Sequence, residues 1–203
     1  TACPLGKYGV HDYNNRTTCE PCGAGEYQDE TGTAKCKLCV KGKYYAGSAG
    51  SGNGAGAESE SVCTECPKGF YAPTEGAHEC LPCPPGSYCG STGTEMYTKC
   101  QPGKYTNGSS QTECAPCPVG RYQESKGSVV CSGCPAGRYL NGIGATNISA
   151  CEACPVGKYG GSEGSKSCSE CPLGYICGDE GMAVGTACPL GKYGVHDYNN
   201  RTT

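Results

Sequence analysis

The chain has 203 residues, including 21 cysteines, 34 glycines and 14 prolines, and its formal net charge is −3. Only 19 residues are Leu, Ile, Val or Phe, and Trp is absent, so the large apolar content lies far below the roughly 20% that an ordinary hydrophobic core needs. The mildly acidic charge argues against a nucleic-acid partner, which requires a basic face. No apolar run approaches the roughly 20 residues of a membrane-spanning helix, so we expect no membrane span in this fragment.

The cysteines offer another source of stability. Each disulfide removes entropy from the unfolded chain, by roughly 2–4 kcal/mol in the loop-closure description, so ten bridges can replace the missing core. Disulfides persist in oxidising compartments. We therefore expect an extracellular or cell-surface location.

The first 22 residues contain the pattern that the rest of the chain repeats: C-P-x-G-x-Y, a polar run, then C-x-x-C, whose last cysteine begins the next copy. We call the first cysteine of each copy the opener. A glycine follows every opener by three residues, and a tyrosine follows all but one by five, Ile176 being the exception. Such arrays consist of units that pack on their neighbours. The openers are Cys3, Cys22, Cys39, Cys66, Cys83, Cys100, Cys117, Cys134, Cys154, Cys171 and Cys188.

This periodicity predicts a fold of small disulfide-rich tandem repeats, with short β-hairpins and irregular loops stacked into an elongated rod and little or no helix. No segment has helical periodicity over ten or more residues, and turn residues recur every few positions. We expect the opener glycine to adopt the positive φ of a tight turn. We expect the tyrosine to be structural as well, with its ring over a disulfide.

Two longer repeats are superimposed on this period. Residues 1–18 recur letter for letter as residues 186–203, which indicates a tandem repeat of 185 residues. Within it the cysteine order of the first half recurs in the second. We therefore divide the chain into a half-repeat over 3–99, a second half-repeat over 100–187, and the start of the next 185-residue repeat over 188–203.

The loops alternate between fixed and variable lengths. Four loops hold thirteen residues between their cysteines, and the loop before each of them varies from thirteen to twenty-three. The longest variable loop contains the low-complexity run Ala46–Ala57, which has no side chain able to anchor it. We expect this insert at the surface.

The disulfide connectivity is open from the residues alone. An interleaved frame pairs Cys3 with Cys22, Cys19 with Cys36, Cys39 with Cys66, Cys63 with Cys80 and Cys83 with Cys89, and likewise in the second half. A rival frame keeps Cys19–Cys36 and Cys63–Cys80 but uses Cys22–Cys39, Cys66–Cys83 and Cys89–Cys100. Both predict bonds between the leading cysteines of successive C-x-x-C pairs, which are Cys19, Cys36, Cys63, Cys80, Cys114, Cys131, Cys151 and Cys168. The other cysteines, Cys3, Cys22, Cys39, Cys66, Cys83, Cys89, Cys100, Cys117, Cys134, Cys154, Cys171, Cys177 and Cys188, are expected in disulfides with less definite partners.

Other chemistry has less support. The spacing C-x2-C-x13-C-x2-C is close to that of zinc sites, but zinc would have to explain eight C-x-x-C pairs in an unbroken series. The histidines, His11, His78 and His196, have no accompanying catalytic constellation. A calcium site near Asp12, or near Asp29 and Glu30, has no supporting spacing. We expect no enzyme activity, no cofactor and no metal.

Four asparagines head N-glycosylation sequons: Asn15, Asn107, Asn147 and Asn200, the last being the copy of Asn15. All fall in variable loops, where a bulky, solvated glycan can be accommodated outside a bridged spine. We therefore expect covalent glycans.

With these motifs the whole chain resembles the ephrin-receptor-like (GCC2/GCC3) cysteine-rich repeats, which are similar in style to EGF and tumour-necrosis-factor-receptor modules. The resemblance lies in units such as Cys117-Pro118-Val119-Gly120-Arg121-Tyr122 and Cys83-Pro84-Pro85-Gly86-Ser87-Tyr88-Cys89. It implies elongated extracellular modules, and its EGF-like bridge order favours the interleaved frame. Such repeats occur in receptors, matrix proteins and protist surface or flagellar-hair proteins, so the family indicates an architecture more than a function.

Two functions follow. The first is a structural building block of a glycosylated extracellular filament or appendage shaft, in which chains associate with themselves head to tail or laterally. The near-identical 185-residue tandem favours it. The alternative is the stalk or ligand-binding ectodomain of a cell-surface receptor or adhesin.

Overall fold

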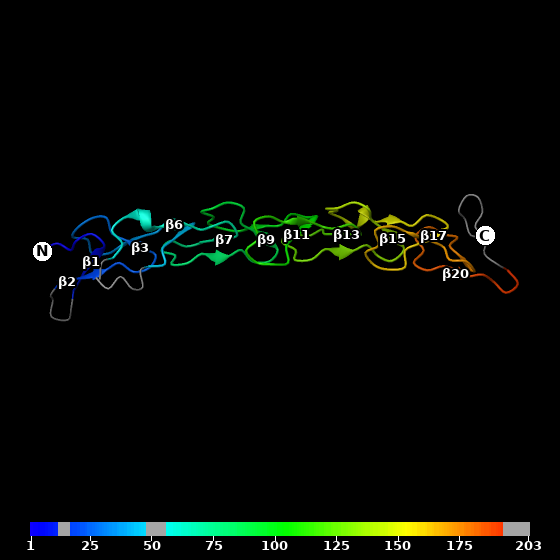
Figure 1. Cartoon of the computed structure of the whole chain (residues 1–203), viewed down its shortest axis with the longest axis horizontal. Coiled ribbons are helices and arrows are strands. Elements are labelled where there is room, and N and C mark those ends of the chain that lie inside the picture. Colours follow the sequence, from blue (N-terminus) through cyan, green and yellow to red (C-terminus); the bar gives the residue numbers. More distant parts are fainter. Residues whose placement is uncertain (12–16, 48–55, 193–203) are drawn as a thin grey trace. The chain divides into compact units, whose positions relative to one another are not determined.

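The computed structural model of the chain describes residues 1–11, 17–47 and 56–192. The chain forms two compact units, one of residues 1–98 with 109–113 and one of residues 99–108 with 114–203. Over the described residues the regular structure consists of two-stranded antiparallel hairpins and two 3₁₀ turns, with no α-helix. Figure 1 shows the hairpins of each unit following one another in chain order. The predicted repeats of short hairpins with almost no helix are confirmed.

The strands are short, and most contain two residues. In the first unit they are β1 (Lys7–His11), β2 (Thr17–Pro21), β3 (Glu26–Tyr27), β4 (Lys37–Leu38), β5 (Lys43–Tyr44), β6 (Thr64–Glu65), β7 (Phe70–Tyr71), β8 (Leu81–Pro82) and β9 (Ser87–Tyr88), with the 3₁₀ turn η1 (Glu60–Val62) before β6. β10 (Thr98–Lys99) follows at the end of this segment. The second unit contains β11 (Lys104–Tyr105), β12 (Ala115–Pro116), β13 (Arg121–Tyr122), β14 (Ser132–Gly133), β15 (Arg138–Tyr139), η2 (Ile148–Ala150), β16 (Glu152–Ala153), β17 (Lys158–Tyr159), β18 (Ser169–Glu170), β19 (Tyr175–Ile176) and β20 (Thr186–Ala187).

One register recurs in the hairpins. The two residues after the opener glycine pair with the two residues before the next opener, as in Arg121↔Gly133 and Tyr122↔Ser132. In eight of the described hairpins these two residues lie inside a C-x-x-C, and the exceptions are β9 with β10 and β19 with β20. A turn precedes the first strand, because the Arg121 N–H donates to the Pro118 carbonyl at 3.1 Å. Gly120 stands third in this turn with φ of +79°, the geometry of a type II turn. The turn folds the opener back over the strand that follows it.

This geometry decides the disulfides. In β1 and β2, Gly9 lies opposite Cys19, and a Cβ placed on Gly9 would be 3.7 Å from the Sγ of Cys3. The folded-back opener therefore meets the cysteine that closes its own loop, with Cα atoms 5.5 Å apart in Cys3–Cys19, within the range that a disulfide spans. The ten bonds are Cys3–Cys19, Cys22–Cys36, Cys39–Cys63, Cys66–Cys80, Cys83–Cys89, Cys100–Cys114, Cys117–Cys131, Cys134–Cys151, Cys154–Cys168 and Cys171–Cys177.

The predicted pairing was therefore wrong in most places. Cys83–Cys89 and Cys171–Cys177 form as the interleaved frame predicts. The bonds common to both frames do not form, because the first cysteine of each C-x-x-C closes the loop before it and the second opens the loop after it. The pairs absent from the structure are Cys3–Cys22, Cys19–Cys36, Cys39–Cys66, Cys63–Cys80, Cys22–Cys39, Cys66–Cys83 and Cys89–Cys100, together with Cys100–Cys117, Cys114–Cys131, Cys134–Cys154 and Cys151–Cys168 in the second half.

Cys188 also departs from the expectation, since it is a free, half-buried thiol. It is the copy of Cys3, whose partner Cys19 is the residue directly after the duplicated 18-residue stretch. The given sequence repeats residues 1–18 in full as residues 186–203 and contains no second copy of Cys19.

Each closed loop is hydrogen-bonded to the next through the main chain. The residue ten positions after an opener donates its N–H to the carbonyl of the preceding opener, as in Gly127 to Cys100 and Gly164 to Cys134, both at 2.8 Å. We call this position the turn position. It has positive φ, and Ser110, with φ of +58°, is its one non-glycine occupant among the described loops that make this bond. The other donors are Gly32, Gly76, Gly93, Ser110, Gly144 and Gly181.

The opener glycine is required for a second reason besides its φ. A Cβ on Gly120 would collide with the carbonyl oxygen of Gly164, the turn position two loops further along. Gly25 and Gly137 face the turn carbonyls of Gly76 and Gly181 in the same way. Close backbone approach of this kind leaves no room for a side chain. The predicted positive φ of the opener glycines is confirmed at all eleven positions.

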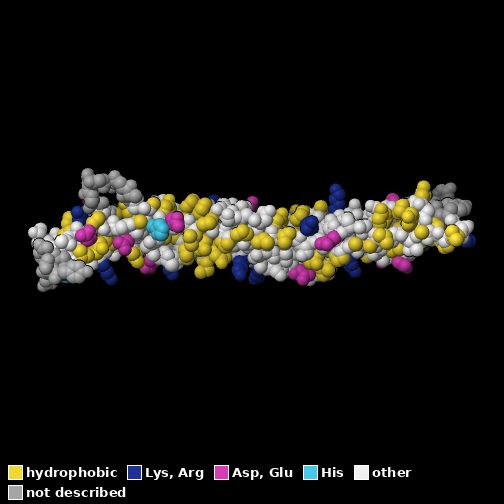
Figure 2. All heavy atoms as spheres, turned by 90° about the horizontal axis from the view of Figure 1, so that it is seen from below, with side chains coloured by type: hydrophobic (Ala, Val, Ile, Leu, Met, Phe, Trp, Pro, Cys, Tyr) yellow, Lys and Arg dark blue, Asp and Glu magenta, His cyan; other side chains and the backbone are white. Residues whose placement is uncertain are grey.

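Sulfur takes the place of an apolar core. Sixteen of the nineteen buried hydrophobic residues in the described part of the chain are cysteines, the others being Ala57, Ala72 and Leu140. The one apolar cluster there consists of Cys134, Leu140 and Cys151, with Tyr122, Ala145 and Ala150 packed against it. On the face in Figure 2, hydrophobic side chains lie at the surface with acidic and basic ones singly between them. The aliphatic residues that the chain does possess are largely exposed.

Replacing both Cys117 and Cys131 by serine is expected to loosen one loop only, because every other bridge closes a separate loop. A loop of this length contributes about 3 kcal/mol by closure entropy. Limited proteolysis should therefore cut the variant first between residues 117 and 131, while non-reducing peptide mapping still recovers Cys100–Cys114 and Cys134–Cys151. Recovery of Cys114 joined to Cys131 in the unmodified protein would contradict the connectivity.

Gly120→Ala is expected to destabilise the second unit by about 2 kcal/mol or more, since it combines a left-handed backbone for a non-glycine residue with a collision against the Gly164 carbonyl. The matched control is Gly142→Ala, where φ is not positive and the nearest atom to a new Cβ is the Leu140 Cδ1 at 4.0 Å. Chemical unfolding of the two variants measures the difference. Equal midpoints would show that the opener glycine is dispensable.

Candidate functional site

The described sequon asparagines, Asn107 and Asn147, are both solvent-exposed. Asn107 follows β11 by two residues, and Asn147 directly precedes η2. Asn15 and Asn200 lie outside the described residues, as does most of the Ala46–Ala57 insert. Each described sequon therefore presents its asparagine to solvent beside an ordered element.

Asn147 also has a structural role. Its Oδ1 accepts a hydrogen bond from the Ser149 N–H at 2.8 Å and caps η2. In the first unit, Ser59 occupies the same place before η1 and accepts from the Ser61 N–H at 3.2 Å. A serine can therefore fill the capping role of Asn147, and the glycan-bearing role can be separated from it.

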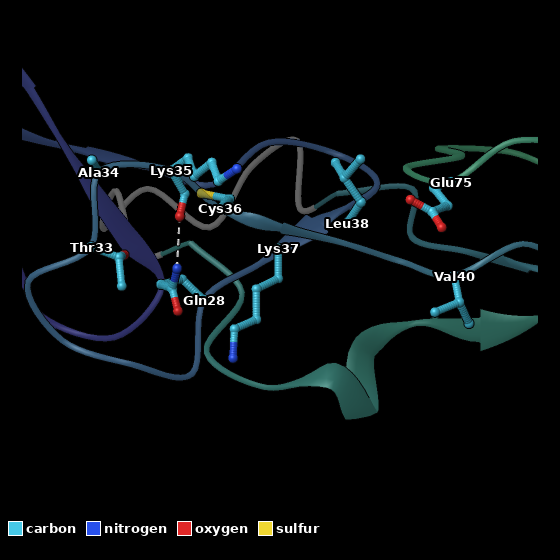
Figure 3. Close-up of a pocket in the computed structure, with 9 residues that line it drawn as sticks. All are labelled: Gln28, Thr33, Ala34, Lys35, Cys36, Lys37, Leu38, Val40 and Glu75. Atoms are coloured by element: carbon cyan, nitrogen blue, oxygen red, sulfur yellow. Dashed lines mark hydrogen bonds between the residues drawn. The ribbon is translucent and has the colours of Figure 1, made fainter.

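A groove of about 740 Å³ lies in the first unit along the loop that contains β4. Figure 3 shows Leu38, Val40 and Glu75 toward one end of this groove. Leu38 and Val40 are 43% and 49% exposed. The remaining lining residues are Gln28, Thr33, Ala34, Lys35, Cys36 and Lys37.

The floor of this groove is held by Gln28, whose side chain is almost fully buried. Its Nε2 donates to the Lys35 carbonyl at 2.8 Å, the contact drawn in Figure 3, and its Oε1 accepts from the Glu30 N–H at 2.9 Å. The buried hydroxyl oxygen of Thr33 has no hydrogen-bond partner. Two satisfied bonds fix the buried amide, as is usual for a buried polar group.

Lys37 joins two carboxylates at the edge of the groove, with its Nζ 2.7 Å from Asp29 and 2.6 Å from Glu30. The hydrogen bond from Lys37 lowers the pKa of Asp29 and the two carboxylates raise the pKa of Lys37. All three side chains are well exposed, so this cluster contributes little to stability. A lowered Asp29 pKa favours folding above about pH 4, and this contribution is lost as the pH falls through the folded pKa.

The described residues contain no group of three or more His, Cys, Asp or Glu side chains placed to hold a metal ion. His78 lies 3.9 Å from Glu79, with both side chains about 70% exposed, and the Nδ1 of His11 is 3.3 Å from the Thr17 hydroxyl. Neither His11 nor His78 lies in an enclosed site beside a nucleophilic side chain. In residues 1–11, 17–47 and 56–192 there is likewise no helix long and apolar enough to cross a bilayer.

In two of the described hairpins the lysine after the opener glycine pairs in register with a glutamate inside the C-x-x-C, and in one of them the two charged groups meet. Lys158 pairs in register with Glu170, and their charged groups are 2.7 Å apart. Lys43 pairs with Glu65 in the backbone but its Nζ lies 3.6 Å from Glu60 instead. Each contact therefore joins residues of one disulfide-closed loop, or of that loop and the C-x-x-C at its end.

The turn position was missed as a functional position by sequence reasoning. A signal existed, because a glycine follows the opener glycine by seven residues in most loops, as in Gly69 and Gly76 or Gly157 and Gly164. The length of the variable loops, and Ser110 in one of these places, weaken this signal.

Comparison with known families gives a match in the middle of the chain. Residues 52–100 and 103–151 each match the family model described as tyrosine-protein kinase ephrin type A/B receptor-like. No curated protein matches the chain. Five of the ten disulfides have both cysteines within the matched residues: Cys66–Cys80, Cys83–Cys89, Cys100–Cys114, Cys117–Cys131 and Cys134–Cys151.

Proposed function

Because the chain carries tandem ephrin-receptor-like cysteine-rich repeats, we propose that it is a structural building block of an extracellular glycosylated filament or appendage shaft. Ten disulfides and this family indicate an extracellular or cell-surface protein of structural or receptor-like type. The proposed repeat has 185 residues and is divided into halves at 3–99 and 100–187, and a further copy begins at 188.

The observation that carries this proposal is the main-chain bonding between successive loops. Gly76 donates to Cys39 and Gly93 donates to Cys66, each at 2.8 Å, and the same bond recurs in the second unit. Such bonds need a residue that accepts positive φ at the turn position, so a series of them can extend along successive loops. A linear array stabilised between neighbours is the behaviour of repeat proteins.

The duplicated stretch supports continuation beyond one repeat. Residues 186–203 are identical in sequence to residues 1–18, opener and sequon included. A block of fixed length joined head to tail generates a fibre without closed symmetry. Lateral association between chains would use side chains on the exposed faces, such as the exposed aliphatic residues.

A groove favours the alternative function. The hollow along β4, with its exposed Leu38 and Val40, is the type of concave apolar surface that accepts a ligand. In the alternative, the repeats form the stalk or the ligand-binding ectodomain of a cell-surface receptor or adhesin. Both functions are compatible with the loop architecture. A receptor or adhesin would bind a ligand on the surface of one repeat, whereas a filament would depend on the succession of repeats.

The two are separated by secreted proteins that contain one, two or four consecutive 185-residue blocks. A shaft requires the maximum dimension from X-ray scattering to increase in proportion to the number of blocks, because in the proposed array each loop would bond to the next across the junction. Reduced and alkylated samples serve as the control and should lose this proportionality. A maximum dimension that levels off with added blocks would contradict the shaft.

Glycosylation is tested at Asn147 with two variants that differ in the cap. Asn147→Ser removes the sequon and keeps a capping oxygen, as Ser59 does before η1, whereas Asn147→Ala removes both. Loss of the cap is expected to cost about 1 kcal/mol. Both variants should lose one glycan mass in the secreted protein, and only the alanine variant should also lose the stability of the cap. An unchanged mass in both would show that Asn147 carries no glycan.

A further inference from the structure

A second hollow, of about 410 Å³, lies in the second unit beside Asn107. Its volume falls at the lower end of the range of small-molecule pockets, roughly 300–1,000 Å³. Val129 and Val130, which line it, are 47% and 60% exposed. The lining is Tyr105, Asn107, Pro118, Arg121, Val129, Val130 and Cys131. A sequon asparagine thus lies on the rim of an apolar surface that nothing in the unit covers.

The two valines cannot turn inward, because the backbone around them is fixed. The Gln123 Nε2 donates to the Val130 carbonyl at 2.7 Å, and the Arg121 Nη1 donates to the Cys131 carbonyl at 2.9 Å. The disulfide Cys117–Cys131 closes the same loop. The exposure of this valine pair is therefore built into the loop.

Asn107 is fixed close to the valines by the residue before it. Thr106 is 5% exposed, and its N–H donates to the carbonyl of Ser128 at 3.3 Å. Asn107 directly follows Thr106, and Val129 directly follows Ser128, so this bond brings the two residues close together. A group attached to the Asn107 amide nitrogen therefore begins within reach of both valines.

The equivalent positions in the other thirteen-residue loops are not an apolar aliphatic pair. The two residues before the closing cysteine are Ala34-Lys35, His78-Glu79 and Lys166-Ser167 in those loops. In none of them does the preceding loop have a sequon asparagine at the position of Asn107, seven residues after its opener. The apolar pair and the sequon occur together in one place.

We propose that the first N-acetylhexosamine of an N-linked glycan on Asn107 covers this hollow. The inference rests on the glycosylation included in the proposed function and goes beyond it by assigning a binding surface to the glycan. A pyranose has C–H faces and an N-acetyl methyl group, which gain from removing valine and tyrosine carbon surface from water. Its hydroxyl groups need donors or acceptors.

Arg121 can supply those donors. A guanidinium carries five N–H groups, and the bond to the Cys131 carbonyl uses one of them. Arg121 also lines the hollow. The site therefore combines an apolar wall with a charged donor, the combination by which proteins commonly orient small polar ligands.

The test measures side-chain exposure of Val129 and Val130 in the secreted glycoprotein by hydroxyl-radical footprinting with mass spectrometry, which also records the occupancy of Asn107. Three samples are compared: the intact glycoprotein, the same protein trimmed enzymatically to one sugar per site, and the variant Ser109→Ala, which lacks the sequon and keeps Asn107. If the oxidation rate follows exposed area, the first two should be oxidised about threefold more slowly at the valine pair than the third.

Val184, 68% exposed and in the same unit, is the internal reference and should be oxidised equally in all three samples. Ser149→Ala, which removes the glycan at Asn147 instead, should leave the valine pair unchanged. Val130→Ser in the glycosylated background should weaken the protection of Val129. These controls separate coverage by the Asn107 sugar from a general effect of glycans.

Full occupancy of Asn107 with equal oxidation in all three samples would refute the inference and leave the glycosylation intact. Protection that disappears in the one-sugar sample would refute it too, since it assigns coverage to the first sugar. Protection that persists in Ser109→Ala and increases with protein concentration would assign the hollow to a second copy of the chain. An unoccupied Asn107 would remove the glycan from this site, and the inference with it.

Discussion

The fold depends on the way the opener turn brings each opener cysteine back against the strand that follows it. The turn at Pro118–Arg121 reverses the chain within four residues. In the first hairpin the register places Gly9 opposite Cys19, and the folded-back opener Cys3 lies against Gly9, so it reaches the cysteine that ends its own loop. The disulfide links the two cysteines that this arrangement brings together, and it stabilises the fold by constraining the unfolded chain. With cysteines forming most of the buried apolar residues in the described part, these closures replace the packing that the composition does not allow.

Contacts between loops use the main chain, and this explains which parts of the sequence are fixed. The opener glycine and the turn position must accept positive φ, and the opener glycine must also admit a carbonyl at its Cα. Ser110 shows that the turn position tolerates a small polar residue, in keeping with the local hydrogen bonding that lets such residues adopt the left-handed region. Most other positions face solvent, so loops of different length and sequence are compatible with one spine.

The sequence predicted the local structure better than the long-range pairing. The frequent turn residues and the absence of helical periodicity indicated short hairpins, and the opener motif indicated positive φ at its glycine, because these features depend on neighbouring residues. The prediction of the disulfide bonds failed because the spacing of the cysteines along the sequence is compatible with several pairings. Choosing Cys117–Cys131 over Cys114–Cys131 requires knowing that the opener folds back on its own strand. Likewise, nothing in the separation of Asn107 from Val130 indicates that Thr106 bonds to Ser128.

Closure of each loop on itself also determines how tension passes along the chain. A pull on the backbone reaches Cys117, crosses the sulfur–sulfur link to Cys131 and continues through Ser132 and Gly133 to Cys134, so the thirteen residues in between carry none of it. Those residues would otherwise add roughly 3.3–3.6 Å each on full extension. The covalent contour that can be stretched therefore consists of the C-x-x-C links and of the segments between Cys89 and Cys100 and between Cys177 and Cys188, which lie outside the closed loops. The residues inside the closed loops add no length to this contour even after their hydrogen bonds have broken.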